Sequence, residues 1–320
     1  MKRYLLIVLL FISYSLVNAQ HLPLLGNYMF NGLTINPAYA GSRKALSIAA
    51  THRTQWAGFE GAPTTQVLSA HGRLERQKLG LGLMFLKDKI GLTNQYGAYG
   101  TLAYYVDFKD KSRKRVNKSY RRYRLFHRLK ESKLSFGLQF GYSHVRTNWS
   151  QAILEEENDP LFTDIPNYEF VPNVGVGMYY YNDVFFAGLS APNLLNTNGS
   201  PFGDERTFGN FLFSTGFLLN LNEYIQWQPS TLLRYIENSP VQFDINSNFI
   251  FYEKLLAGLS YRHQDALIPI VQLYVSDQFR VGYTYEVGIS DLKKYHHGSH
   301  EILLMYEFRF KSKVMHPKYF

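Results

Sequence analysis

The sequence predicts an all-β protein, a transmembrane antiparallel β-barrel of about 14 strands. Three observations favour this fold. The chain begins with an export signal, its later segments alternate apolar and polar residues, and aromatic residues make up 16% of a chain whose mean hydropathy is slightly negative. Successive side chains of a β-strand point to opposite faces, so alternation places one apolar face toward lipid and one polar face toward the lumen. Aromatic girdles at the membrane interfaces account for the composition.

Residues 1–19 read as a cleaved signal peptide. Lys2 and Arg3 form a charged start, an apolar core runs from Tyr4 to Val17, and Ala19 ends a small-residue cleavage site. That core is shorter than the roughly 20 residues that a spanning helix needs. The chain has no cysteine, so neither a lipid anchor on cysteine nor a disulfide is expected. The mature chain therefore starts with a short segment, residues 20–45, ahead of the first strand.

The clearest predicted strand is the last one, His300 to Phe310. One face would carry every second residue: His300, Ile302, Leu304, Tyr306, Phe308 and Phe310. The other face would carry Glu301, Leu303, Met305, Glu307 and Arg309. An apolar outer face that ends on an aromatic residue, backed by a largely polar face, is typical of a barrel strand.

Similar alternation recurs along the chain, most clearly at 134–142, 225–235, 241–248 and 279–287. Weaker segments begin near residues 45, 64, 79, 96, 172, 184, 207, 254 and 269. Together with the last strand they form an even-numbered set, as single-chain bacterial barrels require. The barrel is expected to span residues 46–310, followed by a C-terminal tail, residues 311–320.

The connections between these strands are long on one side and short on the other. If both termini lie in the periplasm, the long ones face outward, which is the usual arrangement. One long connection, residues 109–133, falls on the periplasmic side and contains twelve lysines or arginines. It is either a solvated tether or a contact for an anionic partner, such as the cell-wall layer or an acidic periplasmic protein. Export argues against a nucleic-acid partner.

The sequence gives little support for catalysis, and no cofactor or metal is expected. Glu155–Glu157 lie in a predicted outer loop without an organised acid–base setting. His296, His297 and His300 lack carboxylate or cysteine companions for a metal. Paired glycines, such as Gly80 and Gly82, are expected to allow bends or close packing within strands.

A specific resemblance begins at residue 28. The block Tyr28-Met29-Phe30-Asn31 leads to Ile35-Asn36-Pro37-Ala38-Tyr39-Ala40-Gly41-Ser42-Arg43, and a second block runs from His52 to Thr65 around Gln55-Trp56-Ala57-Gly58-Phe59. This pattern resembles the PorP/SprF family of outer-membrane proteins of the type IX secretion and gliding machinery of Bacteroidetes. The resemblance covers essentially the whole mature chain.

The resemblance implies a non-enzymatic, integral outer-membrane protein that supports secretion or surface retention of an adhesin-like partner, recognised through its C-terminal domain. It also implies contact with periplasmic secretion-system components, besides the outer-membrane lipid around any barrel. The alternative is a passive porin for small solutes, for which a polar inner face (Gln242, Asp244, Asn246, Arg280, Glu286) would suffice.

The motif residues are candidates for binding a partner or for plugging the pore: Asn36, Pro37, Tyr39, Gly41, Arg53, Gln55, Trp56, Gly58, Phe59 and Pro63. Asn36-Pro37 and Ala40-Gly41 are turn formers that would direct the chain into the first strand. The aromatic loop around Trp56 and Phe59 either folds inward as a plug or docks a secreted partner. The residues alone do not separate these two hypotheses.

Overall fold

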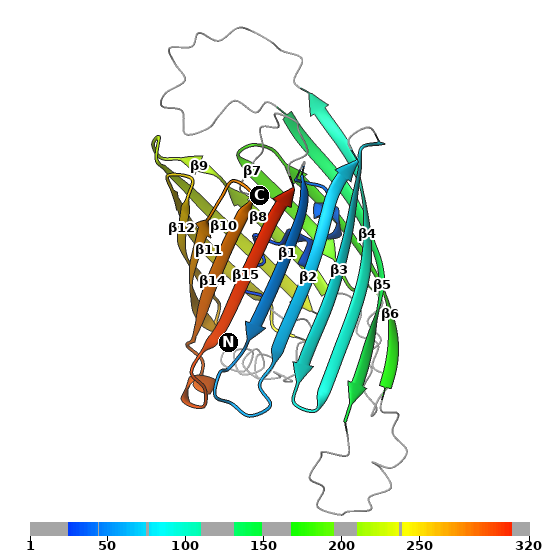
Figure 1. Cartoon of the computed structure of the whole chain (residues 1–320), viewed down its shortest axis with the longest axis vertical. Coiled ribbons are helices and arrows are strands. Elements are labelled where there is room, and N and C mark those ends of the chain that lie inside the picture. Colours follow the sequence, from blue (N-terminus) through cyan, green and yellow to red (C-terminus); the bar gives the residue numbers. More distant parts are fainter. Residues whose placement is uncertain are drawn as a thin grey trace, which may run out of the picture.

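The computed structural model describes residues 25–43, 45–74, 77–109, 131–148, 168–194, 210–236 and 239–308. Within them all strand pairs are antiparallel and follow the chain order around a ring, apart from one interrupted strand, and the first strand pairs with the last. The sheet therefore closes into a barrel (Figure 1). No helix in the described residues is long and apolar enough to cross a membrane.

The ring consists of the following strands: β1 Leu46–Thr54, β2 Thr64–Leu74, β3 Leu79–Ile90, β4 Thr93–Lys109, β5 Glu131–Thr147, β6 Tyr168–Tyr181, β7 Phe185–Ala191, β8 Asn210–Phe217, β9 Leu219–Asn220, β10 Ile225–Ile236, β11 Gln242–Phe251, β12 Leu255–Arg262, β13 Ala266–Tyr274, β14 Phe279–Gly288 and β15 Ser299–Phe308. Both β8 and β9 pair with β10 and flank Leu218, so they form one interrupted strand. The barrel thus has 14 strands, which confirms the predicted fold class.

The two faces of β15 follow the predicted alternation. Its exposed residues are His300, Ile302, Leu304, Tyr306 and Phe308, and its buried residues are Ser299, Glu301, Leu303, Met305 and Glu307. Apolar side chains face outward and carboxylates face inward, which is the reverse of a soluble barrel. The outward face is therefore the lipid face.

The inward face elsewhere is also polar. Asp244, Asn246, Arg280 and Glu286 are all buried, as the alternation predicts. Charged groups tolerate such burial only when they are paired, and these are paired within the lumen. Arg262, for example, lies 3.2 Å from Asp244 and 3.3 Å from Glu286.

Some predicted boundaries need correction. Strand pairing continues to Lys109 and Glu131, so Lys109 and residues 131–133 belong to strands and not to the basic insertion. Lys133 is buried on the inward face of β5. Because it is charged, the start of β5 resembles the end of the basic connection in the sequence. Residues 110–130, the signal peptide 1–19, Glu155–Glu157 and the tail 311–320 lie outside the described residues.

The barrel has two distinct ends. One, here called the loop rim, carries the connections 55–63, 91–92, 263–265 and 289–298. The other, the turn rim, carries the short connections 182–184, 221–224, 252–254 and 275–278. β4 ends and β5 begins at the turn rim, so the basic insertion leaves the barrel on the same side as the short turns (Figure 1).

The lipid face makes a prediction about charge and depth. Leu83, in the middle of β3, and Leu74, at the turn-rim end of β2, both face outward and are exposed. Leu83→Arg should destabilise the barrel by about 2–4 kcal/mol, and the matched Leu74→Arg by no more than about 1 kcal/mol. Urea titrations of protein refolded into vesicles, read by the faster gel migration of the unheated barrel, would test this. Equal destabilisation at both positions would contradict a lipid face.

Candidate functional site: a plugged lumen and a braced rim loop

The lumen is occupied by the N-terminal segment Leu25–Arg43, here called the plug. Figure 1 shows it inside the ring, behind β1 and β2, and almost all of its side chains are buried. It contains two single-turn 3₁₀ helices, η1 Gly32–Thr34 and η2 Pro37–Tyr39. The turns predicted at Asn36-Pro37 and Ala40-Gly41 are present, but they lie inside the barrel.

The motif residues shape the plug locally. The Asn36 side chain accepts a hydrogen bond from the Ala38 backbone N–H at 2.9 Å and so caps η2, with Pro37 at the first helical position. Gly41 has a φ of +75°, a conformation that side chains with a Cβ rarely adopt. The plug therefore folds back sharply after Tyr39, and the chain returns toward β1.

The middle of the plug is hydrogen-bonded to the wall formed by β5, β6 and β7. The Asn36 amide donates to the Met178 carbonyl at 3.0 Å. The Ser135 hydroxyl donates to the Ala38 carbonyl at 2.6 Å, and the Ser190 hydroxyl donates to the Ile35 carbonyl at 2.6 Å. Wall side chains thus satisfy backbone groups that the short 3₁₀ turns leave unpaired inside the barrel.

Inward-facing glycines of the strands let the plug approach the wall. A Cβ at Gly137 would collide with the backbone of Ala38, one at Gly80 with the Ala40 carbonyl, and one at Gly177 with the Asn36 side chain. The expectation that paired strand glycines allow close packing is therefore confirmed at Gly80 and Gly82, the latter of which faces Leu33 and Ala40.

Both ends of the plug are held by carboxylates of β15. Glu301 accepts hydrogen bonds from the backbone N–H groups of Gly26, at 2.6 Å, and Asn27, at 2.9 Å. At the other end, the Arg43 guanidinium donates to the Glu307 carboxylate. Burial alone would lower the pKa of Arg43, but the Tyr39 hydroxyl and Glu307 outweigh burial and raise the pKa of Arg43 above its ordinary value. Arg43 therefore stays charged in the lumen.

Arg53, one of the candidate site residues, belongs to the polar lining of the lumen. Its guanidinium lies 2.8 Å from Glu286 and 3.6 Å from Glu301, and it is 2% exposed. Arg53 therefore neutralises the same carboxylate that holds the start of the plug. Its role in the structure is to complete this buried network, and it does not reach the surface.

The described part of the plug packs closely against the wall. A cavity of about 20 Å³ lies beside Tyr28, Asn36 and Tyr39, room for about one water. The Tyr39 ring packs edge-on against His71 and Tyr179, with ring centroids 5.2 and 5.5 Å apart. The plug is therefore packed like a protein core.

The remaining candidate residues lie in the loop 55–63, here called the rim loop, at the loop rim. Its base is closed by a hydrogen bond from the Gln55 N–H to the Pro63 carbonyl at 2.9 Å. It is braced by the neighbouring connection 289–298: the Ala57 N–H donates to the Gly298 carbonyl at 2.7 Å, and the His297 N–H donates to the Ala57 carbonyl at 2.8 Å. These two backbone hydrogen bonds, one in each direction, hold one side of the rim loop against residues 297 and 298.

Its aromatic residues do not enter the lumen. Phe59 is 51% exposed, and Trp56 lies at the rim with its ring centroid 6.2 Å from that of His296. The hypothesis that this loop plugs the pore is therefore wrong, because the N-terminal plug already occupies the lumen. Gly58, at a φ of +89°, leaves room for His297 where a Cβ would approach that ring to 2.8 Å.

The structure therefore separates the predicted motif residues into groups. Asn36, Pro37, Tyr39 and Gly41 lie in the plug. Arg53 lies in the lumen wall, and Gln55, Trp56, Gly58, Phe59 and Pro63 lie in the rim loop. Arg43, Glu301 and Glu307 were not among the residues predicted from the sequence to form the site. The signal for them was present, because both glutamates fall on the inward face of the predicted last strand and a buried carboxylate needs a partner.

The described residues form a membrane barrel whose lumen holds the plug and whose loop rim carries the braced rim loop. In the described residues, no group of three or more His, Cys, Asp or Glu side chains is placed to hold a metal ion. His296 instead accepts a hydrogen bond from the Gly298 N–H, and His300 is bonded to the Tyr283 hydroxyl. These features define a class, the plugged β-barrel proteins of the outer membrane.

Residues 17–306 match the family model described as type IX secretion system membrane protein PorP/SprF. The chain belongs to this family and is an integral outer-membrane protein. Membership implies association with secretion-system components, and family and fold together favour a non-enzymatic role.

Solved structures with a similar outline are outer-membrane proteins. Omp33 of Acinetobacter baumannii is 10% identical, with a TM-score of 0.44, over 84% of this chain and 100% of that protein. OmpF of Salmonella typhi, solved with daunomycin, is 10% identical, with a TM-score of 0.37, over 82% and 96% of the two chains. A KdgM porin is 9% identical, with a TM-score of 0.36, over 82% and 99%. No curated protein matches the sequence.

The plug contact makes a prediction about pore closure. Gly137→Ala places a Cβ against the Ala38 backbone, which should weaken plug packing by about 1–3 kcal/mol and raise ion conductance in planar bilayers. Gly100→Ala is the matched control, because its Cβ would meet only the Phe140 carbonyl, at 3.9 Å. A Gly137→Ala protein as silent as the control would show that this contact does not hold the plug.

A second prediction concerns the anchor at Glu307. Glu307→Gln removes the charge opposite Arg43 and Arg280, the latter 2.6 Å away. Two buried guanidinium groups would lose their counter-charge, at a stability cost of about 3–5 kcal/mol. Glu60→Gln, in the exposed part of the rim loop, should cost almost nothing. Thermal unfolding of both variants beside the parent, followed by the gel shift, would measure the difference.

Proposed function

We propose that this protein is a non-enzymatic docking barrel that supports secretion or surface retention of an adhesin-like protein, recognised through its C-terminal domain. Membership of the PorP/SprF family supports the setting in type IX secretion. The observation that carries the proposal is the filled lumen: the plug occupies the space through which a porin would pass solute. A barrel without an open lumen acts through its surfaces.

The rim loop is the surface that we assign to the secreted partner. It presents Phe59, half exposed, on a backbone that is braced by residues 297 and 298 and by the Gly91 N–H, which donates to the Gly61 carbonyl at 2.8 Å. Exposed aromatic residues on a rigid backbone are favourable for binding, because little conformational entropy is lost on association. The loop rim faces outward in the proposed orientation, with the turn rim toward the periplasmic components.

A passive porin is the alternative function, and conductance separates it from the proposal. The polar inner face that would suit a porin is engaged with the plug at several points: Asn246 donates to the Tyr28 hydroxyl at 2.6 Å, and Ser69 donates to Asn31 at 2.9 Å. Purified protein in planar bilayers should therefore be electrically silent. Large, steady pores in the parent protein would favour the porin.

The rim loop can be tested in cells. Trp56→Ala combined with Phe59→Ala should leave a folded, membrane-inserted barrel and abolish display of the adhesin on the cell surface, because truncating an interfacial aromatic residue costs about 2 kcal/mol or more. Tyr252→Ala with Tyr224→Ala removes two exposed aromatic residues at the turn rim and serves as control. Surface immunofluorescence of the adhesin, with gel mobility of the barrel as folding check, is the measurement. Normal display in the Trp56/Phe59 variant would remove the rim loop from the mechanism.

A further inference from the structure

The lipid face of the barrel has one sector that breaks the apolar pattern. Among the described strand side chains, the lysines and arginines that face outward are Lys87 and Lys89 on β3 and Arg146 on β5. All three lie near the loop rim and flank the same strand, β4. The Asp and Glu side chains described in the strands lie on the inward face, so no described strand carboxylate balances these cations from the lipid side.

The strand register places these cations in two continuous rows of polar residues across the sheet. One row crosses the wall as His52, Gln66, Lys87, Tyr96 and His144, each directly opposite the next. The adjacent row, closer to the rim, runs through Thr64, Lys89, Asn94 and Arg146. Lys87 also lies over the Tyr96 ring, with its Nζ atom 5.8 Å from the ring centroid. Five neighbouring strands thus carry a polar, basic band at one depth.

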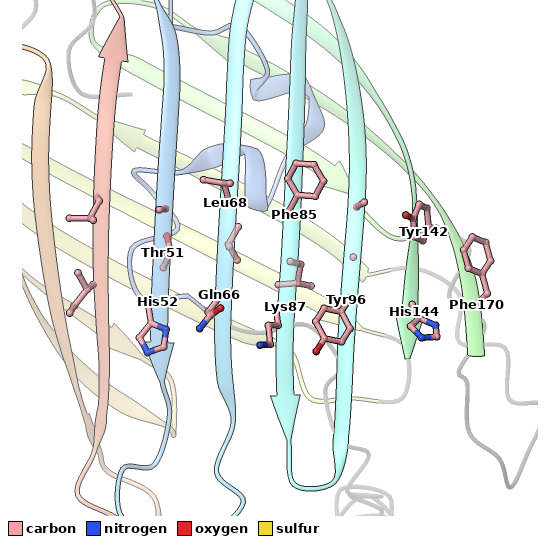
Figure 2. Close-up of a pocket in the computed structure, with 17 residues that line it drawn as sticks. Thr51, His52, Gln66, Leu68, Phe85, Lys87, Tyr96, Tyr142, His144 and Phe170 are labelled. Carbon is pink, nitrogen blue, oxygen red and sulfur yellow. The ribbon is translucent and has the colours of Figure 1, made fainter. Parts of the chain in front are cut away.

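An apolar groove adjoins this band on the side of the membrane centre. It has a volume of about 890 Å³, within the range of about 300–1,000 Å³ that ligand sites occupy. Figure 2 shows its labelled residues at two levels: Leu68, Phe85, Tyr142 and Phe170 above, and His52, Gln66, Lys87, Tyr96 and His144 below. The groove is hollow because Ala50 and Ala98 stand in register with the larger Leu68, Phe85 and Tyr142.

We propose that this groove binds a phosphate-bearing lipid of the surrounding leaflet, with its acyl chains over Ala50 and Ala98 and its phosphate against Lys87, Lys89 and Arg146. The groove lies on the face that contacts the bilayer, so a lipid reaches it without leaving the membrane. Arginine and lysine are the side chains that best hold phosphate, and near the interface their charge is tolerated on a barrel surface. The change from apolar to cationic matches the change from acyl chain to headgroup along a lipid.

The described strands on the opposite side of the barrel carry no such cations on their outward face. At the loop-rim ends of β8, β10, β12 and β14 the outward residues are Phe211, Tyr235, Tyr261 and Val287, an aromatic and aliphatic girdle without lysine or arginine. If the barrel bound anionic lipid without a specific site, the cations would not need to lie on one side only. The one-sided band indicates a single lipid position, on the wall formed by β1 to β5.

The test is lipid binding by the full barrel in neutral detergent, measured by native mass spectrometry with lipid A that carries a phosphate. Each Lys or Arg strengthens binding to anionic lipid about five-fold, so Lys87→Gln, Lys89→Gln and Arg146→Gln together should weaken binding at least ten-fold. The matched control, Lys78→Gln, Lys254→Gln and Lys293→Gln, removes three exposed charges outside the band and should bind like the parent. Ala98→Trp fills the hollow without a charge change and should also lose binding.

Several results would overturn the proposal. Parent-like affinity in the Lys87/Lys89/Arg146 variant, or equal binding of dephosphorylated lipid A, would remove the phosphate from the site. Binding of inorganic phosphate alone with similar affinity would make it an ion site. A mass corresponding to two barrels, lost in the Ala98→Trp variant, would assign the groove to a second copy of the chain. Unheated gel mobility establishes that each variant is folded.

Discussion

The structure depends on two carboxylates of the last strand. Glu301 and Glu307 lie on the inward face of β15, about 20 Å apart along the strand, and they hold the two ends of the plug through Gly26, Asn27 and Arg43. The same strand pairs with β1 and closes the barrel. A single strand therefore seals the wall and fixes what fills it. Arg53 pairs with Glu301, and Arg43 and Arg280 pair with Glu307, so each carboxylate has a counter-charge inside the lumen.

The plug and the wall are complementary in both polarity and shape. Serine hydroxyls of the wall donate to plug carbonyls at its 3₁₀ turns, and the Asn36 amide of the plug donates to a wall carbonyl. Glycines of the strands make room for the plug backbone. Neither part is a plausible structure without the other. The barrel without its plug would leave paired glycines and serines facing an empty channel, and the plug alone is too short to fold. A filled lumen also explains why the exposed surfaces, and not a pore, carry the proposed functions.

The barrel could be predicted from the sequence because its signal is local. In His300–Phe308 outward and inward residues alternate, so the position of each residue in the strand predicts the face on which it lies. The same period of two recurs in the other strands. The position of the plug could not be predicted in this way. Asn36-Pro37 and Gly41 indicate turns wherever they lie, but the partner of Gly26 is 275 residues away, and no local pattern encodes that pairing. The location of the aromatic loop could not be predicted for a related reason, since Trp56 and Phe59 look the same in a plug and on a rim. The ends of the basic insertion were misplaced because Lys133 carries a charge on the inward face of a strand, where charge resembles a loop.

The hydrogen bonds between the plug and the last strand also determine how a mechanical load would pass through the barrel. The described part of the plug begins at Leu25, and the first of its hydrogen bonds to the wall are the two that Glu301 accepts. Tension applied to the plug at Leu25 would therefore pass through these bonds to β15 and then, through the paired strands, to β1 and β14. A pull on the plug would thus load the strands at which the barrel closes.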